Sequence, residues 1–485
     1  MKYTLLFLPC NMSVCVDAGT TVLSAMIKAG LHPDAPCGGK GTCGKCRVQI
    51  GEETVLACHT VVEQDMTVML PKESETCILT SGINASAEAD GENAYVVAFD
   101  IGTTTLVGYL LNGKTGKLLS TASTINPQTQ YGADVISRIQ AVMNSKANLQ
   151  NCIVRSLRKV IWDLVSQSGI SSEKITLATV VGNTAMHHLL FGIDPTPLVT
   201  PPYMPKISEA MEQSNRGFLP ISYKGDLRVL PNIAGFVGGD TVACMVSTRF
   251  DQQEKLTLLI DIGTNGEMVL GNKNRRIACS TAAGPAFEGA KISCGMRGAE
   301  GAVDHVWLEN ENVLYHVIGD TEPKGLCGSG LLDLVAVLLD TGIISESGRM
   351  KGKQYTLCEN VILTQKDVRE VQLAKAAIRA GIELLSEQLG VKVEDIQNVY
   401  LAGAFGNYMN PASACRIGMI PPKLLDKITA IGNAAGEGAK LCALSRAEYN
   451  YSIQLAANTE FLELASLPQF QDRYVDALEF EEEEE

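Results

Sequence analysis

The tetrapeptide Asp-Ile-Gly-Thr occurs twice in this chain, and this repeat constrains the fold more than any other feature of the sequence. The copies begin at Asp100 and Asp261, about 160 residues apart, and each follows an apolar segment typical of a buried strand. Strand, turn and helix patterns alternate from Tyr95 to about residue 465, which predicts an α/β architecture with buried sheets. Two strands that end in the same turn at this separation indicate a duplicated fold.

Each copy of the repeat places an aspartate at a strand end, before a turn rich in glycine and hydroxyl groups. Glycine lets backbone N–H groups approach phosphate oxygens, and threonine hydroxyls complete an anion-binding concavity. The aspartates are expected to hold Mg²⁺ through water, because Mg²⁺ keeps much of its hydration shell. Two such turns that face each other would clamp a triphosphate between two lobes. The residues predicted to bind nucleotide here are Asp100, Gly102, Thr103, Thr104, Asp261, Gly263, Thr264 and Asn265.

Four cysteines near the N-terminus follow the pattern C-x5-C-x2-C-x11-C in a loop rich in glycine. They are Cys37, Cys43, Cys46 and Cys58. A loop that wraps an iron–sulfur cluster needs backbone close to the sulfides, and a Cβ would obstruct that approach. Two ligands at C-x2-C spacing can reach one iron. Zinc is the competing interpretation, but zinc sites usually pair two C-x2-C halves, and the second half is missing here.

These four cysteines are therefore predicted to be the ligands of a 2Fe–2S cluster. A helix predicted at residues 22–29, opened by Thr21, precedes the loop, as in a β-grasp ferredoxin domain.

The composition divides the chain and excludes several classes of function. We expect a ferredoxin domain at 1–71, a polar linker at 72–94, two lobes at 95–256 and 257–480, and an acidic tail at 481–485. A net charge of −14 argues against nucleic-acid binding. No apolar run approaches the ~20 residues of a membrane span. Since no export signal is recognisable, the fifteen cysteines predict a cytoplasmic protein rather than a disulfide framework.

Three further segments resemble motifs of the superfamily of actin, sugar kinases and heat-shock chaperones. Residues 401–406 resemble the adenosine motif, while residues 179–184 and 431–436 resemble the two segments that connect the lobes. The fold class is thus an α+β β-grasp ferredoxin domain followed by an α/β two-lobed actin-like ATPase domain. The resemblance implies nucleotide contacts from Gly403, Gly406, Asn183 and Gly432.

Two candidate positions keep two interpretations each. The resemblance implies that Asp240, at the start of a helix, positions the attacking water; the alternative is that it only caps that helix. Residues 284–289 and 325–330 form two glycine-dense loops within the second lobe, and the second of them opens a helix, so it is either a phosphate or nucleoside contact or a site of tight packing.

Taken as a whole, the chain resembles the reductive activators of corrinoid proteins, which join a 2Fe–2S domain to an actin-like ATPase domain. The resemblance implies an ATP-hydrolysing reductase, with ATP and Mg²⁺ as cofactors, that returns one electron to an inactive Co(II) corrinoid protein. Its implied partners are the corrinoid protein of a methyltransferase system and a low-potential electron donor. No nucleic acid or membrane is expected, and a homodimer is the default assembly. The alternatives are a nucleotide-gated ferredoxin for another low-potential acceptor and a small-molecule kinase of the same superfamily.

Overall fold

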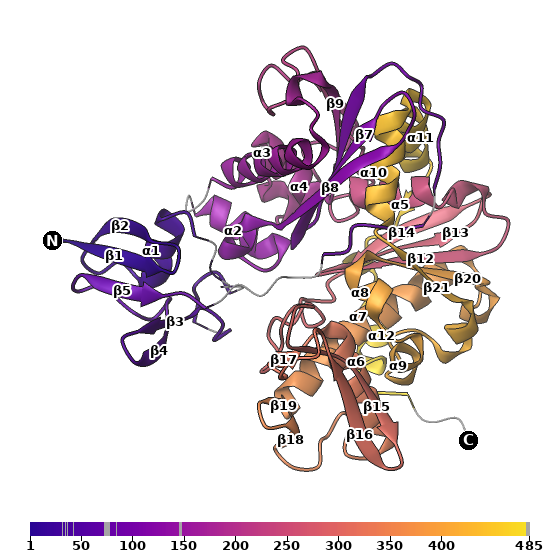
Figure 1. Ribbon diagram of the computed structural model, residues 1–485. Coiled ribbons are helices and arrows are strands. Elements are labelled where there is room, and N and C mark those ends of the chain that lie inside the picture. Colours follow the sequence, from indigo (N-terminus) through magenta and orange to yellow (C-terminus); the bar gives the residue numbers. More distant parts are fainter. Residues whose placement is uncertain are drawn as a thin grey trace.

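The computed structural model describes residues 1–31, 33, 35, 37–41, 43–71, 78–83, 85–144 and 148–481 (Figure 1). The first part of the predicted linker, 72–77, and the acidic tail beyond Glu481 lie outside the described residues. Within this part of the chain, no helix combines the length and the apolar character needed to cross a lipid bilayer.

The N-terminal domain has the predicted β-grasp arrangement. A five-stranded sheet in the order β2-β1-β5-β3-β4 packs against helix α1, and β1 pairs parallel with β5. Thr21 caps α1 by accepting a hydrogen bond from the backbone N–H of Ser24 at 3.2 Å, as its position in the sequence suggested. The elements are β1 (Lys2–Leu8), β2 (Met12–Asp17), α1 (Val22–Lys28), β3 (Arg47–Ile50), β4 (Glu53–Leu56) and β5 (Met66–Met69).

The remainder of the chain contains two six-stranded sheets that share the same five-stranded arrangement, which confirms the duplicated fold; the sixth strand lies at opposite edges of the two sheets. The first sheet has the order β10-β11-β9-β6-β7-β8 and the second β21-β20-β12-β13-β14-β22. In each sheet the strand before the Asp-Ile-Gly-Thr turn pairs antiparallel with the next strand and parallel with a later one. The first sheet comprises β6 (Tyr95–Ile101), β7 (Thr105–Asn112), β8 (Leu118–Ile125), β9 (Ile175–Gly182), β10 (Met211–Ser214) and β11 (Asp226–Val229). The second comprises β12 (Thr257–Ile262), β13 (Gly266–Gly271), β14 (Arg276–Thr281), β20 (Asn398–Ala402), β21 (Ile428–Gly432) and β22 (Glu460–Phe461).

Helices cover both faces of each sheet, and one core joins the two sheets. Helices α5 and α10 share a buried apolar cluster with residues from both sheets, while separate clusters lie on the outer faces. In Figure 1, α10 (yellow) therefore lies beside β7, far from it in sequence, and α11 packs on α10. The helices are α2 (Val135–Met143), α3 (Leu149–Ser168), α4 (Thr184–Phe191), α5 (Gly239–Ser247), α6 (Gly328–Asp340), α7 (Gln365–Leu389), α8 (Gly403–Tyr408), α9 (Pro411–Arg416), α10 (Ala434–Leu444), α11 (Arg446–Ala457) and α12 (Pro468–Asp476). Smaller sheets are formed by β15 (Ala302–Glu309), β16 (Asn312–Val317) and β17 (Gly325–Leu326), and by β18 (Gln354–Cys358) and β19 (Val361–Thr364).

The described part of the predicted linker is packed along the second lobe. The backbone N–H of Ile83 donates to the carbonyl of Ile431 at 3.1 Å, and that of Asn433 donates to the carbonyl of Ser81 at 2.9 Å. Ile78 and Ile83 pack against the apolar cluster shared by the two sheets. Residues 78–83 thus run beside the end of β21 and the start of α10, even though their composition is that of a linker.

Candidate functional site

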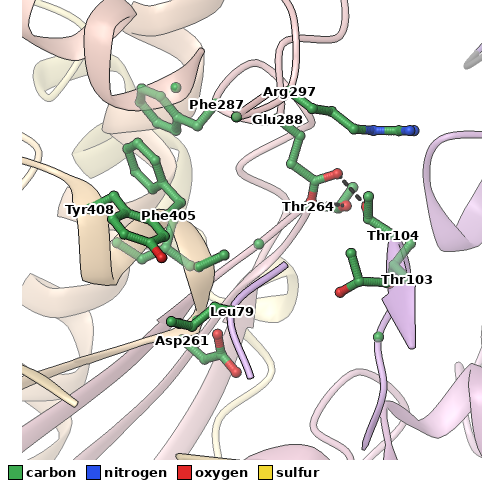
Figure 2. Close-up of a pocket in the computed structure, with 18 of the residues that line it drawn as sticks. Leu79, Thr103, Thr104, Asp261, Thr264, Phe287, Glu288, Arg297, Phe405 and Tyr408 are labelled. Atoms are coloured by element: carbon green, nitrogen blue, oxygen red, sulfur yellow. Dashed lines mark hydrogen bonds between the residues drawn. The ribbon is translucent and has the colours of Figure 1, made fainter. Parts of the chain in front are cut away.

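A cleft of about 470 Å³ lies where the two Asp-Ile-Gly-Thr turns meet. The β6–β7 turn forms one wall and the β12–β13 turn another, so the duplicated strands bring both turns to one place. Figure 2 shows Thr103 and Thr104 on one side of this cleft, Thr264 next to Thr104 with the Glu288 carboxylate between them, and Asp261 across from Thr103. The facing arrangement is the one expected for a clamp on a phosphate chain.

Most residues predicted to bind nucleotide line this cleft. The lining includes Asp100, Gly102, Thr103, Thr104, Asn183, Asp240, Asp261, Gly263, Thr264, Asn265 and Gly403. Gly406 and Gly432 do not line it. Gly406 packs on Leu401, and a Cβ on Gly432 would lie 2.4 Å from the carbonyl oxygen of Ser81. These two glycines therefore serve backbone packing next to the cleft.

Gly403 is required by geometry. Its φ is +81°, and a Cβ there would lie 2.6 Å from Oδ1 of Asp261. The backbone at the start of α8 can therefore pass close to the second aspartate only at a glycine. Asn183 is also held in place, since its Nδ2 donates to Oγ1 of Thr103 at 3.0 Å while its Oδ1 caps α4.

Four carboxyl groups gather in the floor of the cleft: Asp100, Asp240, Asp261 and Glu267. Burial raises the pKa of Asp100 to about 6. Burial and neighbouring carboxylates raise the pKa of Asp240 and of Asp261 to about 7, and that of Glu267 well above its usual range.

A bound cation would relieve the mutual repulsion of these groups, and hard oxygen ligands are those that Mg²⁺ prefers. Among the described residues, no three His, Cys, Asp or Glu side chains are close enough together to hold a metal ion directly. The carboxylates therefore fit a hydrated Mg²⁺ held largely through water.

Asp240 lies in the first turn of α5, but it is not the N-cap of that helix. Gly238 is the N-cap, without a side-chain capping bond, and Oδ1 of Asp240 accepts from the N–H of Thr241 at 2.8 Å. The capping interpretation was thus wrong in its strict form. Its carboxyl lines the cleft and carries a raised pKa, which suits a group that accepts a proton or orients a water.

One wall of the cleft is aromatic. The rings of Phe287 and Phe405 stack with centroids 4.6 Å apart and planes 11° from parallel, and Tyr408 lies beside them (Figure 2). The 325–330 loop also reaches the cleft through Gly328 and Ser329 at the start of α6, so the binding interpretation of that loop is favoured. This wall offers an apolar surface for a nucleoside base.

Four polar or aromatic residues of the cleft are not among those predicted from the sequence. Glu267 directly follows the second turn, and Asn433 donates to Oδ2 of Asp100 at 2.9 Å. Glu288 accepts hydrogen bonds from Thr104 at 2.5 Å and from Thr264 at 2.7 Å, and so joins the two turns. Phe405 lies within the segment resembling the adenosine motif. A carboxylate inside an otherwise apolar glycine-dense loop was the available signal for Glu288.

The four predicted cluster ligands converge in the N-terminal domain. The Sγ atoms of Cys43 and Cys37 are 3.3 Å apart, and Cys58 contacts Cys46. The structure thus pairs Cys37 with Cys43 and Cys46 with Cys58, in place of the Cys43–Cys46 pair expected from C-x2-C spacing. Burial, then the neighbouring Cys46 thiol, raises the pKa of Cys58 to about 12.

Two pairs of thiols match the two irons of a 2Fe–2S cluster, each of which takes two cysteine ligands. The loop that presents them has positive φ at each of its glycines: Gly38, Gly39, Gly41 and Gly44. Non-glycine residues rarely adopt this conformation, which explains the composition of the loop.

Comparisons with protein families cover almost the whole chain. The model described as the 2Fe–2S iron–sulfur cluster binding domain matches residues 9–77, and the RACo middle region matches residues 95–253. The C-terminal domain of RACo, the ASKHA domain, matches residues 255–485.

Curated relatives and a solved structure extend this similarity. The corrinoid activation enzyme RamQ of Eubacterium limosum is 38% identical over 79% of this chain and 69% of its own length. The Co(II) methylated amine-specific corrinoid protein reductase of Methanosarcina barkeri is 30% identical over 53% of this chain and 52% of its own length. A solved reductive activator for corrinoid, iron–sulfur protein is 28% identical, with a TM-score of 0.73 over 99% of this chain and 98% of that one.

Proposed function

Because the chain belongs to the family of reductive activators of corrinoid proteins, we propose that it is an ATP-dependent reductase of an inactive Co(II) corrinoid protein. It delivers one electron and returns the cobalt to Co(I), the state that accepts a methyl group. The observation that carries this proposal is the presence, in one chain, of four converging thiols and two facing phosphate turns.

The residues divide into two groups by role. Cys37, Cys43, Cys46 and Cys58 would hold the 2Fe–2S cluster, which supplies one-electron transfer when bound. The cleft would bind ATP with Mg²⁺, its threonine hydroxyls and backbone N–H groups toward the phosphates and its aromatic wall toward the base.

Asp240 would orient the water that attacks the terminal phosphate, and its raised pKa suits a group that accepts a proton near neutral pH. The other three carboxylates would hold hydrated Mg²⁺ beside the phosphates.

ATP is needed because reduction of Co(II) by an ordinary ferredoxin is uphill. Each 100 mV of mismatch costs about 2.3 kcal/mol per electron, so a few hundred millivolts are within reach of one ATP. Closure of the two lobes around a nucleotide is the movement that this fold makes available.

We place the protein in the cytoplasm. The support is that no two cysteines of the described residues are joined by a disulfide, as expected where thiols stay reduced.

The proposal is tested by anaerobic assay of the purified chain with its cluster. Reduction of a Co(II) corrinoid protein from the same organism is followed by visible absorption, with and without MgATP. We expect ATP-dependent formation of Co(I) and ATP hydrolysis that rises when the Co(II) protein is added. ATP use that depends instead on a small phosphate acceptor would favour a kinase, and unchanged Co(II) would contradict the reductase.

A further inference from the structure

The loop of residues 287–297, here called the cradle loop, contacts two different parts of the molecule. On one side, Glu288 and Arg297 line the nucleotide cleft (Figure 2). On the other side, Nζ of Lys45 donates to the carbonyl oxygens of Gly289 and of Gly295, the latter at 2.7 Å. The same short loop therefore lies between the nucleotide cleft and the ferredoxin domain.

Lys45 is part of the cluster loop, so its contact joins that loop to the cradle loop. It lies between Cys43 and Cys46, two of the predicted cluster ligands, so it belongs to the cluster loop itself. An ammonium group has three donors, and two of them are used by carbonyls of the cradle loop. Hydrogen bonds from a charged donor are among the stronger ones in proteins.

The cradle loop is shaped to present these carbonyls. A Cβ on Gly289 would lie 2.4 Å from the carbonyl oxygen of Met296, and a Cβ on Gly295 would lie 2.4 Å from that of Gly289. The two ends of the loop are thus in direct backbone contact, and side chains at either glycine would separate them. The two carbonyls that receive Lys45 converge for this reason.

The cluster loop also touches the first lobe. A Cβ on Gly38 would lie 3.1 Å from the carbonyl oxygen of Tyr131, so the two backbones approach closely there. Figure 1 shows the ferredoxin domain as a separate body to one side of the two lobes. Its cluster loop is nevertheless seated against both of them.

Glu288 links the contact between the cluster loop and the cradle loop to nucleotide binding. Its carboxylate accepts the hydroxyl hydrogens of Thr104 and Thr264, and each hydroxyl has only one hydrogen to donate. A phosphate oxygen that accepts from either threonine must take that hydrogen from Glu288. The negative charges of phosphate and carboxylate also repel each other, so a triphosphate would displace Glu288.

A buried cation that attracts the Glu288 carboxylate lies on α2. Arg138, on α2, is fully buried, and its Nη1 and Nη2 atoms have no hydrogen-bond partner among the described residues. Burial lowers the pKa of Arg138 to about 10, and the charge of Glu288 is the strongest influence that opposes this shift. Although its Nε donates to the carbonyl of Gly132 at 3.0 Å, a buried guanidinium with two unsatisfied nitrogens favours a carboxylate that moves toward it.

We propose that the cradle loop is the docking site for the ferredoxin domain's own Cys43–Cys46 turn, and that a nucleoside triphosphate releases this domain by displacing Glu288. The inference rests on the proposed function, because it requires a nucleotide in the cleft. The released domain would then be free to present its cluster to a partner protein.

The test is hydrogen–deuterium exchange, followed by mass spectrometry, on the full chain with its cluster. Peptides that span the cluster loop and the cradle loop are compared with and without a non-hydrolysable MgATP analogue. We expect the nucleotide to accelerate exchange in the cluster loop on the order of tenfold, the effect of losing one charge-assisted contact. In Lys45→Gln exchange should be fast without nucleotide and should not rise further. Lys40→Gln, which removes an exposed lysine of the same loop, should behave as wild type.

A second variant tests the displacement of Glu288 separately from the docking of the ferredoxin domain. Glu288→Ala should bind the analogue at least as tightly as wild type in calorimetry, yet should lose the nucleotide-dependent change in exchange. Glu300→Ala, at an exposed position beyond the cradle loop, is its control. Analogue binding without any change in cluster-loop exchange would overturn the docking inference alone. Failure of the wild-type chain to bind the analogue would overturn the proposed function, and this inference with it.

Discussion

Nδ2 of Asn433 lies 2.9 Å from Oδ2 of Asp100, so the first residue before α10 is tied to the first phosphate turn, 333 residues earlier. The same side chain caps α10, because its Oδ1 accepts from the N–H of Gly436 at 2.7 Å. Its backbone N–H binds the carbonyl of Ser81, in the segment that leads from the ferredoxin domain. One residue thus connects the cleft, a helix of the shared core and the linker.

Replacement of Asn433 separates these roles. Asn433→Ala should lower the free energy of unfolding by about 1 kcal/mol through loss of the cap, and should also weaken nucleotide binding. Asn433→Ser keeps a capping oxygen but is too short to reach Asp100, so it should retain stability while still weakening binding. Thermal denaturation and calorimetry with MgADP measure the two effects. Equal nucleotide affinity in both variants and wild type would contradict a role for the contact with Asp100.

The buried carboxylates predict an unusual dependence of stability on pH. Asp240 has a pKa raised to about 7, above its unfolded value of roughly 3.9, so its burial becomes progressively unfavourable as the pH rises from 4 to 7. In EDTA and without nucleotide, Asp240→Asn should therefore be more stable than wild type at pH 8, by about 1.4 kcal/mol per unit of pKa difference. This advantage should vanish near pH 4.

The difference in stability between Asp240→Asn and wild type is free of the pH effect of His187, which acts in the opposite direction. Burial lowers the pKa of His187 to about 4, so protonation of the unfolded state destabilises the fold below pH 6.5, equally in both proteins. Melting temperatures recorded across the pH range give the difference directly. If Asp240→Asn melted at a lower temperature than wild type at pH 8, burial of the Asp240 carboxylate would not destabilise the fold.

The pairing of thiols predicts which cysteines are indispensable. Cys46→Ser and Cys58→Ser each remove one ligand of the same pair, and both should lose most of the bound iron. Cys10→Ser, at an exposed position outside the loop, should keep the iron content of the wild type. Iron and sulfide analysis of anaerobically purified protein, with EPR of the reduced form, distinguishes these cases. Full iron content in Cys58→Ser would exclude this residue as a ligand.

The close approach of Ser81 predicts that position 432 must be glycine for the linker segment 81–83 to keep its place. Both Gly432 and Gly390 have positive φ, but a Cβ meets the Ser81 carbonyl at Gly432 and nothing within 4 Å at Gly390. Gly390→Ala should cost about 1 kcal/mol of strain, whereas Gly432→Ala should cost more and displace residues 81–83. Loss of hydrogen-exchange protection at Ile83, whose N–H binds Ile431, would report the displacement. Equal costs at the two positions would mean that the linker segment is not tightly held.

Local sequence patterns were enough to predict the architecture and much of the site. The repeated turn gave the duplicated sheets, and glycine spacing among the cysteines gave the cluster loop, because both depend on short-range backbone geometry. Turn residues on corresponding strands of a duplicated fold must meet, so most residues predicted to bind nucleotide do line one cleft.

What the sequence could not supply were contacts between segments far apart in the chain. Glu288 joins two turns and Lys45 reaches carbonyls some 250 residues away, and neither relation leaves a periodic signal. The pairing of Cys46 with Cys58 likewise depends on how the loop folds back and not on residue spacing. Short-range chemistry therefore determined which groups this protein carries. Tertiary packing alone decided that the cluster loop and the phosphate turns both contact the cradle loop. Only the folded backbone places Lys45 and the two threonines within hydrogen-bonding distance of that loop.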